Sequence, residues 1–84
     1  MDGVLFSFVS ASKTRVILVK VFEGSMSVKQ LSEGTAISLN LTSRALKELE
    51  AEGVIICLNP KKQKGRLYEL TSSGLEIQAE LRKF

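Results

Sequence analysis

Hydrophobic and polar positions alternate with a helical period between residues 38 and 53. The stripe that we expect to face the core consists of Leu39, Thr42, Leu46 and Leu49. Ser38 is a suitable N-cap for this segment, and Gly53 is a suitable stop. The pattern therefore predicts a helix over residues 38–53.

A shorter helix is predicted immediately before it. Ser27 and Gln30 have the spacing of a capping box, in which the two side chains satisfy amide groups at a helix start. This spacing indicates a helix over residues 27–34, followed by a turn at residues 35–37. Two helices that meet across a tight turn form a helix-turn-helix.

Residues 16–22 are ambiguous because their β-branched side chains would also suit a buried strand. Ser12 as N-cap and Gly24 as stop favour a helix over residues 12–24, since that interval is too long for a typical strand. This helix is apolar around most of its circumference, so we expect one face on the core and another on a partner subunit. Residues 1–11 are interpreted as an apolar N-terminal extension.

The second half of the chain predicts a β-hairpin with a basic tip. Residues 54–58 and 67–70 are β-prone, and the loop between them carries four cations and no acidic residue. Residues 25 and 26 are expected to add a short strand, and Thr71 to cap a last helix over residues 71–84. The expected fold is an α+β winged helix-turn-helix: a three-helix core, a two- or three-stranded β-wing over residues 54–70 and a C-terminal helix, in one domain over residues 1–84.

Composition and charge narrow the function. The chain has 84 residues and a net charge of +3, with the acidic residues Glu48, Glu50 and Glu52 set apart from the basic loop. This uneven distribution of charge favours binding to an anionic partner at one surface of the domain. The absence of histidine and of an evident carboxylate pair disfavours an enzyme, a metal site and any cofactor. A single cysteine, interpreted as a small apolar strand residue, and the lack of a signal or membrane segment predict a cytoplasmic protein.

Two groups of side chains are candidates for contact with double-stranded DNA. On the long helix, Arg44 suits guanine and Asn40 suits adenine, and the full set is Ser38, Asn40, Ser43, Arg44 and Lys47. The alternative is a solvated face with Arg44 paired to Glu48. In the hairpin the candidates for phosphate contact are Lys61, Lys62, Lys64 and Arg66. Their alternative role is a solubilising turn that discourages edge pairing.

The run from Ser38 to Glu52, followed by Gly53-Val54-Ile55, resembles the recognition-helix and first-wing-strand segment of the ArsR/MarR winged-helix superfamily. The runs 57–60 and 64–71, with Gly74, resemble small archaeal transcriptional regulators of that type. The resemblance covers about residues 12–84. It implies a recognition helix that starts at Ser38, a basic wing and dimerisation through the terminal helices. The chain departs from the pattern in the apolar Leu39 and Leu41 and in its lack of metal-sensor ligands.

The predicted function is sequence-specific binding of double-stranded DNA by a homodimeric transcriptional regulator. The candidate dimer contacts are Leu5, Phe6, Val19, Phe22, Ile77, Leu81 and Phe84. The alternative is a winged-helix adaptor in a macromolecular assembly, in which Leu39 and Leu41 would contact a protein partner. Binding of structured RNA has no specific support in the sequence.

Overall fold

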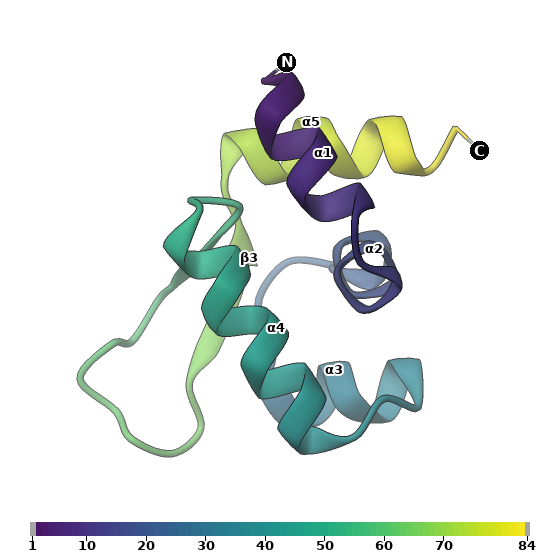
Figure 1. The fold of residues 1–84 in the computed structure, drawn as a ribbon. Helices are drawn as coiled ribbons and strands as arrows, with labels where there is room; N and C mark the ends of the chain where they lie inside the picture. Colours follow the sequence, from purple (N-terminus) through teal and green to yellow (C-terminus); the bar gives the residue numbers. More distant parts are fainter. Residues whose placement is uncertain (1, 84) are drawn as a thin grey trace.

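The computed structural model describes residues 2–83 as five helices and a three-stranded antiparallel sheet (Figure 1). The elements are α1 (Gly3–Ser10), α2 (Lys13–Val21), β1 (Met26–Ser27), α3 (Val28–Thr35), α4 (Leu39–Ala51), β2 (Ile55–Cys57), β3 (Leu67–Leu70) and α5 (Ser72–Leu81). The strand order is β1-β3-β2, with Ile55 opposite Leu70 in the β2–β3 hairpin. Helices α1 and α5 lie at one end of the molecule, whereas α3 and the start of α4 lie at the other.

Local side-chain caps start four of the helices at the positions that the sequence predicted. Ser12 Oγ accepts from the amide of Arg15, Ser38 Oγ from that of Leu41 and Thr71 Oγ1 from that of Gly74. Ser27 and Gln30 form the expected capping box, with bonds of 3.1 and 2.9 Å. Each bond satisfies an amide that has no partner inside its own helix, so these polar residues define where the helices begin.

The N-terminal segment is a helix rather than an extension. Asp2 is its N-cap, and the carboxylate Oδ1 accepts from the amide of Val4 at 2.8 Å. The following helix, α2, is shorter than expected and ends at Val21 instead of near Gly24. Its last carbonyls are satisfied by α5, because Gln78 Nε2 donates to the oxygens of Val19 and Phe22 at 2.9 and 2.8 Å. Side chains distant in sequence therefore set this helix end.

The core lies between α2, α3, α4, the sheet and α5, and it corrects the expected dimer contacts. Four of those candidates are at most 8% exposed within the protomer, namely Val19, Phe22, Ile77 and Leu81. Leu5 and Phe6 are half-buried and pack against the same core, and Phe84 lies outside the described residues. Helix α2 has an additional apolar face, and this face is covered by α1, whose Val9 is fully buried. No partner subunit is needed to bury these side chains.

Thr71 joins the base of the hairpin to the end of α4. The hydroxyl donates to the carbonyl oxygens of Gly53 and Val54, and the Thr71 amide also donates to the Val54 oxygen at 3.0 Å. Gly74 of α5 packs directly on that oxygen, where an added Cβ would overlap it. The close approach fixes α5 against the point from which the hairpin extends.

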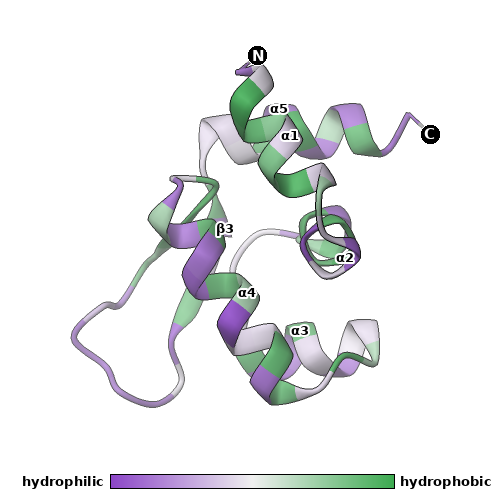
Figure 2. Ribbon diagram, viewed as in Figure 1, coloured by the Kyte–Doolittle hydropathy of each residue, from purple (hydrophilic) through white to green (hydrophobic). Residues whose placement is uncertain are grey.

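The hairpin tip is hydrophilic and α1 is strongly hydrophobic, as Figure 2 shows. Helix α1 has no charged side chain, and its Val4 is 79% exposed. Helix α1 therefore presents apolar surface, whereas the hairpin tip is charged. Within residues 2–83, every helix is too short or too polar to cross a membrane.

Candidate nucleic-acid interface

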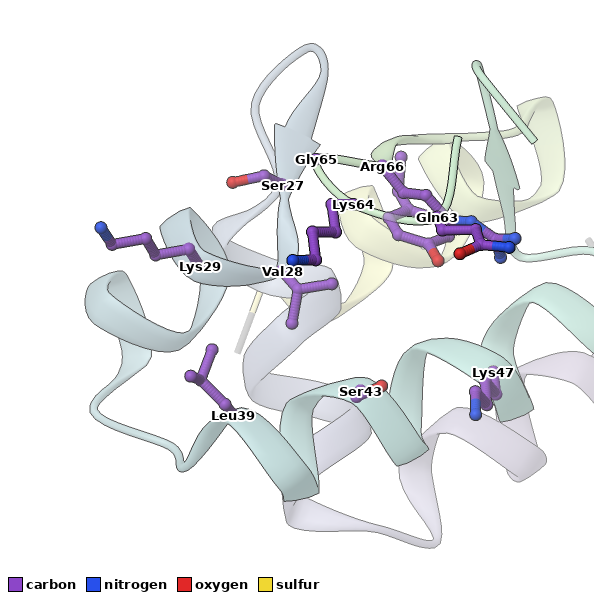
Figure 3. Close-up of a pocket in the computed structure, with 11 residues that line it drawn as sticks. Ser27, Val28, Lys29, Leu39, Ser43, Lys47, Gln63, Lys64, Gly65 and Arg66 are labelled. Atoms are coloured by element: carbon purple, nitrogen blue, oxygen red, sulfur yellow. The ribbon is translucent and has the colours of Figure 1, made fainter. Parts of the chain in front are cut away.

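A concavity of about 840 Å³ lies between α4, the start of α3 and the loop that joins β2 to β3. Figure 3 shows Lys64 extending from this loop toward the start of α3, and Leu39 projecting from the first turn of α4 into the same space. Its lining comprises Ser27, Val28, Lys29, Leu39, Ser43, Lys47, Gln63, Lys64, Gly65, Arg66 and Tyr68. We call this concavity the α4–wing groove.

The α4–wing groove is basic. It is lined by the cationic side chains of Lys29, Lys47, Lys64 and Arg66, and none of the described residues in its lining is acidic. Lys29 stands at the second position of α3, where the positive end of the helix dipole disfavours a cation. Four positive charges on three separate elements create a local field that attracts a polyanion.

The outward face of α4 carries the predicted base-reading side chains. Asn40, Arg44 and Lys47 are exposed along its crest, Ser43 is half-buried on the groove side, and Ser38 is occupied as the N-cap. The inward stripe differs from the prediction at one position, because Leu39 is 55% exposed. Ala45, which was not expected in the core-facing stripe, is buried together with Thr42, Leu46 and Leu49.

The alternative in which Arg44 pairs with Glu48 is not observed, because Glu48 is contacted from α2 instead. Arg15 Nη2 lies 3.3 Å from Glu48 Oε2, and the same guanidinium stacks on Phe8 with its carbon 4.0 Å from the ring centroid. Arg15 Nη1 also donates to the carbonyl oxygen of Phe8 at 2.9 Å. Arg15 thus ties α1 and α2 to α4, neutralises an acidic group on α4, and leaves Arg44 exposed.

The four basic residues of the loop divide into two kinds. Lys61, Lys62 and Lys64 are exposed, whereas Arg66 is half-buried and bonded within the loop. Arg66 Nε donates to the oxygen of Lys62 at 2.6 Å, and its Nη2 donates to that of Pro60 at 3.2 Å. Arg66 therefore shapes the loop that presents the three lysines.

Asn59 is a second organiser of the loop, and sequence reasoning missed its role. Its Oδ1 accepts from the amide of Leu67 at 2.8 Å, and its Nδ2 donates to the oxygen of Gly65 at 3.2 Å. Lys29 and Gln63 were also missed as lining residues. Lys29 carried a usable signal, since a cation in the first turn of a predicted helix opposes the dipole and suggests a functional reason.

Comparison with known proteins agrees with this arrangement. Residues 17–56 match the model of a family described as winged helix-turn-helix DNA-binding, so the match runs from α2 through α3 and α4 into β2. No curated protein and no solved structure gives a significant match to the chain. The matched segment contains the helix-turn-helix, and the β2–β3 hairpin that follows supplies the wing. The chain therefore has a winged helix-turn-helix fold, and residues 17–56 within it are similar to a DNA-binding family of that fold.

Proposed function

We propose that the protein is a homodimeric transcriptional regulator that binds double-stranded DNA through the α4–wing groove and the crest of α4. The observation that carries this proposal is the gathering of Lys29, Lys47 and Lys64 from three elements around one concave surface. A duplex backbone is a continuous line of negative charge, and cations on neighbouring elements can contact successive phosphates. Occupation of promoter DNA would then regulate transcription.

The N-terminal half of α4 is the part that enters the major groove. Asn40 and Arg44 are exposed there and carry the donors and acceptors that pair with adenine and guanine edges. Glu50 and Glu52 follow toward the other end of the helix, where they would repel phosphates at close range. Insertion therefore stops short of the last turn.

The wing lies along the sugar-phosphate backbone beside this contact. Lys61, Lys62 and Lys64 are exposed on a loop that Asn59 and Arg66 hold by side-chain bonds to backbone groups. A loop ordered in advance loses less conformational entropy when its side chains meet phosphates. Such contacts position the domain without reading sequence.

Dimerisation is proposed to use the outward face of α1. Val4 is 79% exposed on a helix without charged side chains, and Leu5 and Phe6 are half-buried beside it. Sedimentation equilibrium should report a dimer that Val4→Glu converts to a monomer, while Leu75→Glu on α5 does not. A monomeric native protein at high micromolar concentration would exclude the dimer.

The experiment that tests DNA binding is fluorescence anisotropy with a random-sequence duplex across a salt series. The native chain is compared with a Lys61→Glu, Lys62→Glu, Lys64→Glu variant and with a Lys13→Glu, Lys20→Glu, Lys83→Glu control that changes the net charge equally. We expect the wing variant to lose affinity and about one unit of salt slope for each phosphate contact removed. The control should retain most of the native slope. Equal losses in both variants would show that net charge alone, and not the wing, governs binding.

The alternative function, a protein-interaction adaptor, draws support from Leu39 and Leu41, which are 55% and 50% exposed at the start of α4. Contiguous apolar surface often marks a protein interface, and each of these two leucines could contribute to one. A folded native protein that fails to bind any duplex at low salt would favour the adaptor. The cations around Leu39 favour DNA instead.

A further inference from the structure

Two exposed leucines flank Asn40 on the first turn of α4. Leu39 lines the α4–wing groove, and Leu41 lines a smaller hollow toward α2 that also contains Arg44. We propose that Leu39 and Leu41 contact the 5-methyl groups of thymines on either side of an adenine read by Asn40. This inference rests on the proposed function and names the kind of half-site that the domain prefers, one in which adenine is flanked by thymines.

The helical geometry places the three side chains in the required order. Successive residues of an α-helix are separated by about 100° around the axis, so Leu39 and Leu41 lie on opposite sides of Asn40. Asn40 itself is exposed on the crest between the groove and the hollow. When α4 enters the major groove with its N-terminal end foremost, the residues of its first turn lie nearest the base edges, and the two leucines there flank Asn40. Thymine is the base that presents an apolar methyl group there.

The core does not account for these two leucines. The core-facing positions of α4 are already filled by Thr42, Ala45, Leu46 and Leu49. Leu39 and Leu41 are therefore available for a contact outside the protomer, and they are 55% and 50% exposed.

The charge around Leu39 identifies the partner. Lys47 and Lys64 line the same groove, so a ligand that fills this groove and covers Leu39 also meets cations. The major groove of an A·T-rich duplex combines apolar methyl groups with flanking phosphates, and it therefore complements both properties at once. An apolar protein surface would leave these cations without counter-charges.

The probe that isolates the methyl groups is a 24-base-pair duplex of alternating adenine and thymine, compared with the same duplex in which deoxyuridine replaces thymidine. Every internal adenine in the first duplex has a thymine on each side, whereas the second duplex lacks only the methyl groups. Burial of one methyl corresponds to about a fourfold change in affinity. We expect the native protein to bind the thymine duplex between about fourfold and about fifteenfold more tightly.

The leucines are tested with a Leu39→Ala, Leu41→Ala variant and a Leu75→Ala control, since Leu75 has a similar exposure of 56% on the distant helix α5. The double variant should bind the uracil duplex like the native protein and prefer thymine by less than twofold, while the control keeps the native preference. Circular dichroism establishes that each variant is folded.

The outcomes separate this inference from the proposed function. Native protein that binds both duplexes equally, or a thymine preference that survives in the double variant, would overturn the leucine contacts and leave DNA binding intact. Equal loss of affinity for both duplexes in the double variant would also overturn methyl recognition. Native protein that binds neither these duplexes nor random DNA would overturn both proposals and favour a protein partner.

Discussion

A methyl group added at Gly74 is predicted to destabilise the junction between α4, the wing and α5. An added Cβ would overlap the carbonyl oxygen of Val54 and lie 2.9 Å from Cδ2 of Leu70. The Val54 oxygen cannot move away freely, because it accepts from both the amide and the hydroxyl of Thr71. The Gly74→Ala variant must therefore displace α5 or weaken those bonds.

The magnitude follows from opposing terms. Overpacking of a filled site costs about 1–3 kcal/mol, and weakening the two bonds to Val54 adds about 1 kcal/mol for each. Replacing glycine by alanine inside a helix stabilises the folded state by about 1 kcal/mol through helix propensity. The free energy of unfolding should thus fall by about 2–4 kcal/mol, which lowers the midpoint of thermal unfolding by roughly 10–30 °C in a domain of this size.

Gly34 provides a matched control, because it also lies in a helix and an alanine Cβ there would have no heavy atom within 4 Å. Gly34→Ala should raise the free energy of unfolding by about 0.5 kcal/mol through helix propensity and reduced freedom of the unfolded chain. Urea denaturation monitored by circular dichroism measures both changes. A Gly74→Ala variant as stable as Gly34→Ala would refute the account of this junction.

Three further substitutions test other parts of the site. Asn59→Ala removes two bonds that organise the wing loop and should lower the free energy of unfolding by about 1–2 kcal/mol in urea titrations, whereas the exposed Gln63→Ala should change it by less than about 0.5 kcal/mol. Arg15→Ala loses the contacts that join α1 and α2 to α4 and should lower the free energy of unfolding by about 2 kcal/mol in the same titrations. Lys13→Ala, in the same turn, should leave it nearly unchanged, and equal effects of the two substitutions would contradict the structural role of Arg15. Arg44→Ala should weaken binding to a selected operator by about 1–3 kcal/mol while random duplex is little affected, and equal losses on both would refute base reading by Arg44.

Local chemistry made much of the helical framework predictable. Ser12, Ser38 and Thr71 cap helices through hydrogen bonds to amides three residues later, and that spacing is visible in the sequence. The turn between α3 and α4 likewise depends on neighbouring residues, with Ala36 in the left-handed region at a φ of 59°. Signals of this kind do not require knowledge of the rest of the fold.

Features that depend on distant residues could not be read in this way. The end of α2 is set by Gln78, 56 residues after Phe22, so the nearby Gly24 gave a misleading stop. The apolar surplus of α2 suggested a partner subunit only because α1 was not recognised as the helix that covers it. The burial of Ile77 and Leu81 likewise depends on the packing of α5 against the core.

In the candidate interface, too, some features follow from neighbouring residues and others from residues distant in the sequence. The basic hairpin and the polar crest of α4 were predictable from charge and helical spacing. Their approach across one groove, the addition of Lys29 and the internal bonding of Arg66 depend on how α3, α4 and the hairpin pack together. An arginine in a basic loop can face a phosphate or a backbone carbonyl, and sequence does not distinguish the two.

The claim that the α4–wing groove binds DNA is tested most directly by nuclear magnetic resonance titration of ¹⁵N-labelled protein with duplex DNA. We predict that the largest amide shifts fall on residues 38–47, on the loop 59–66 and on Lys29, while α1 and α5 change little beyond any effect of dimerisation. Shifts concentrated on α5 or on the outer face of the sheet, with residues 38–47 and the wing unmoved, would contradict the account.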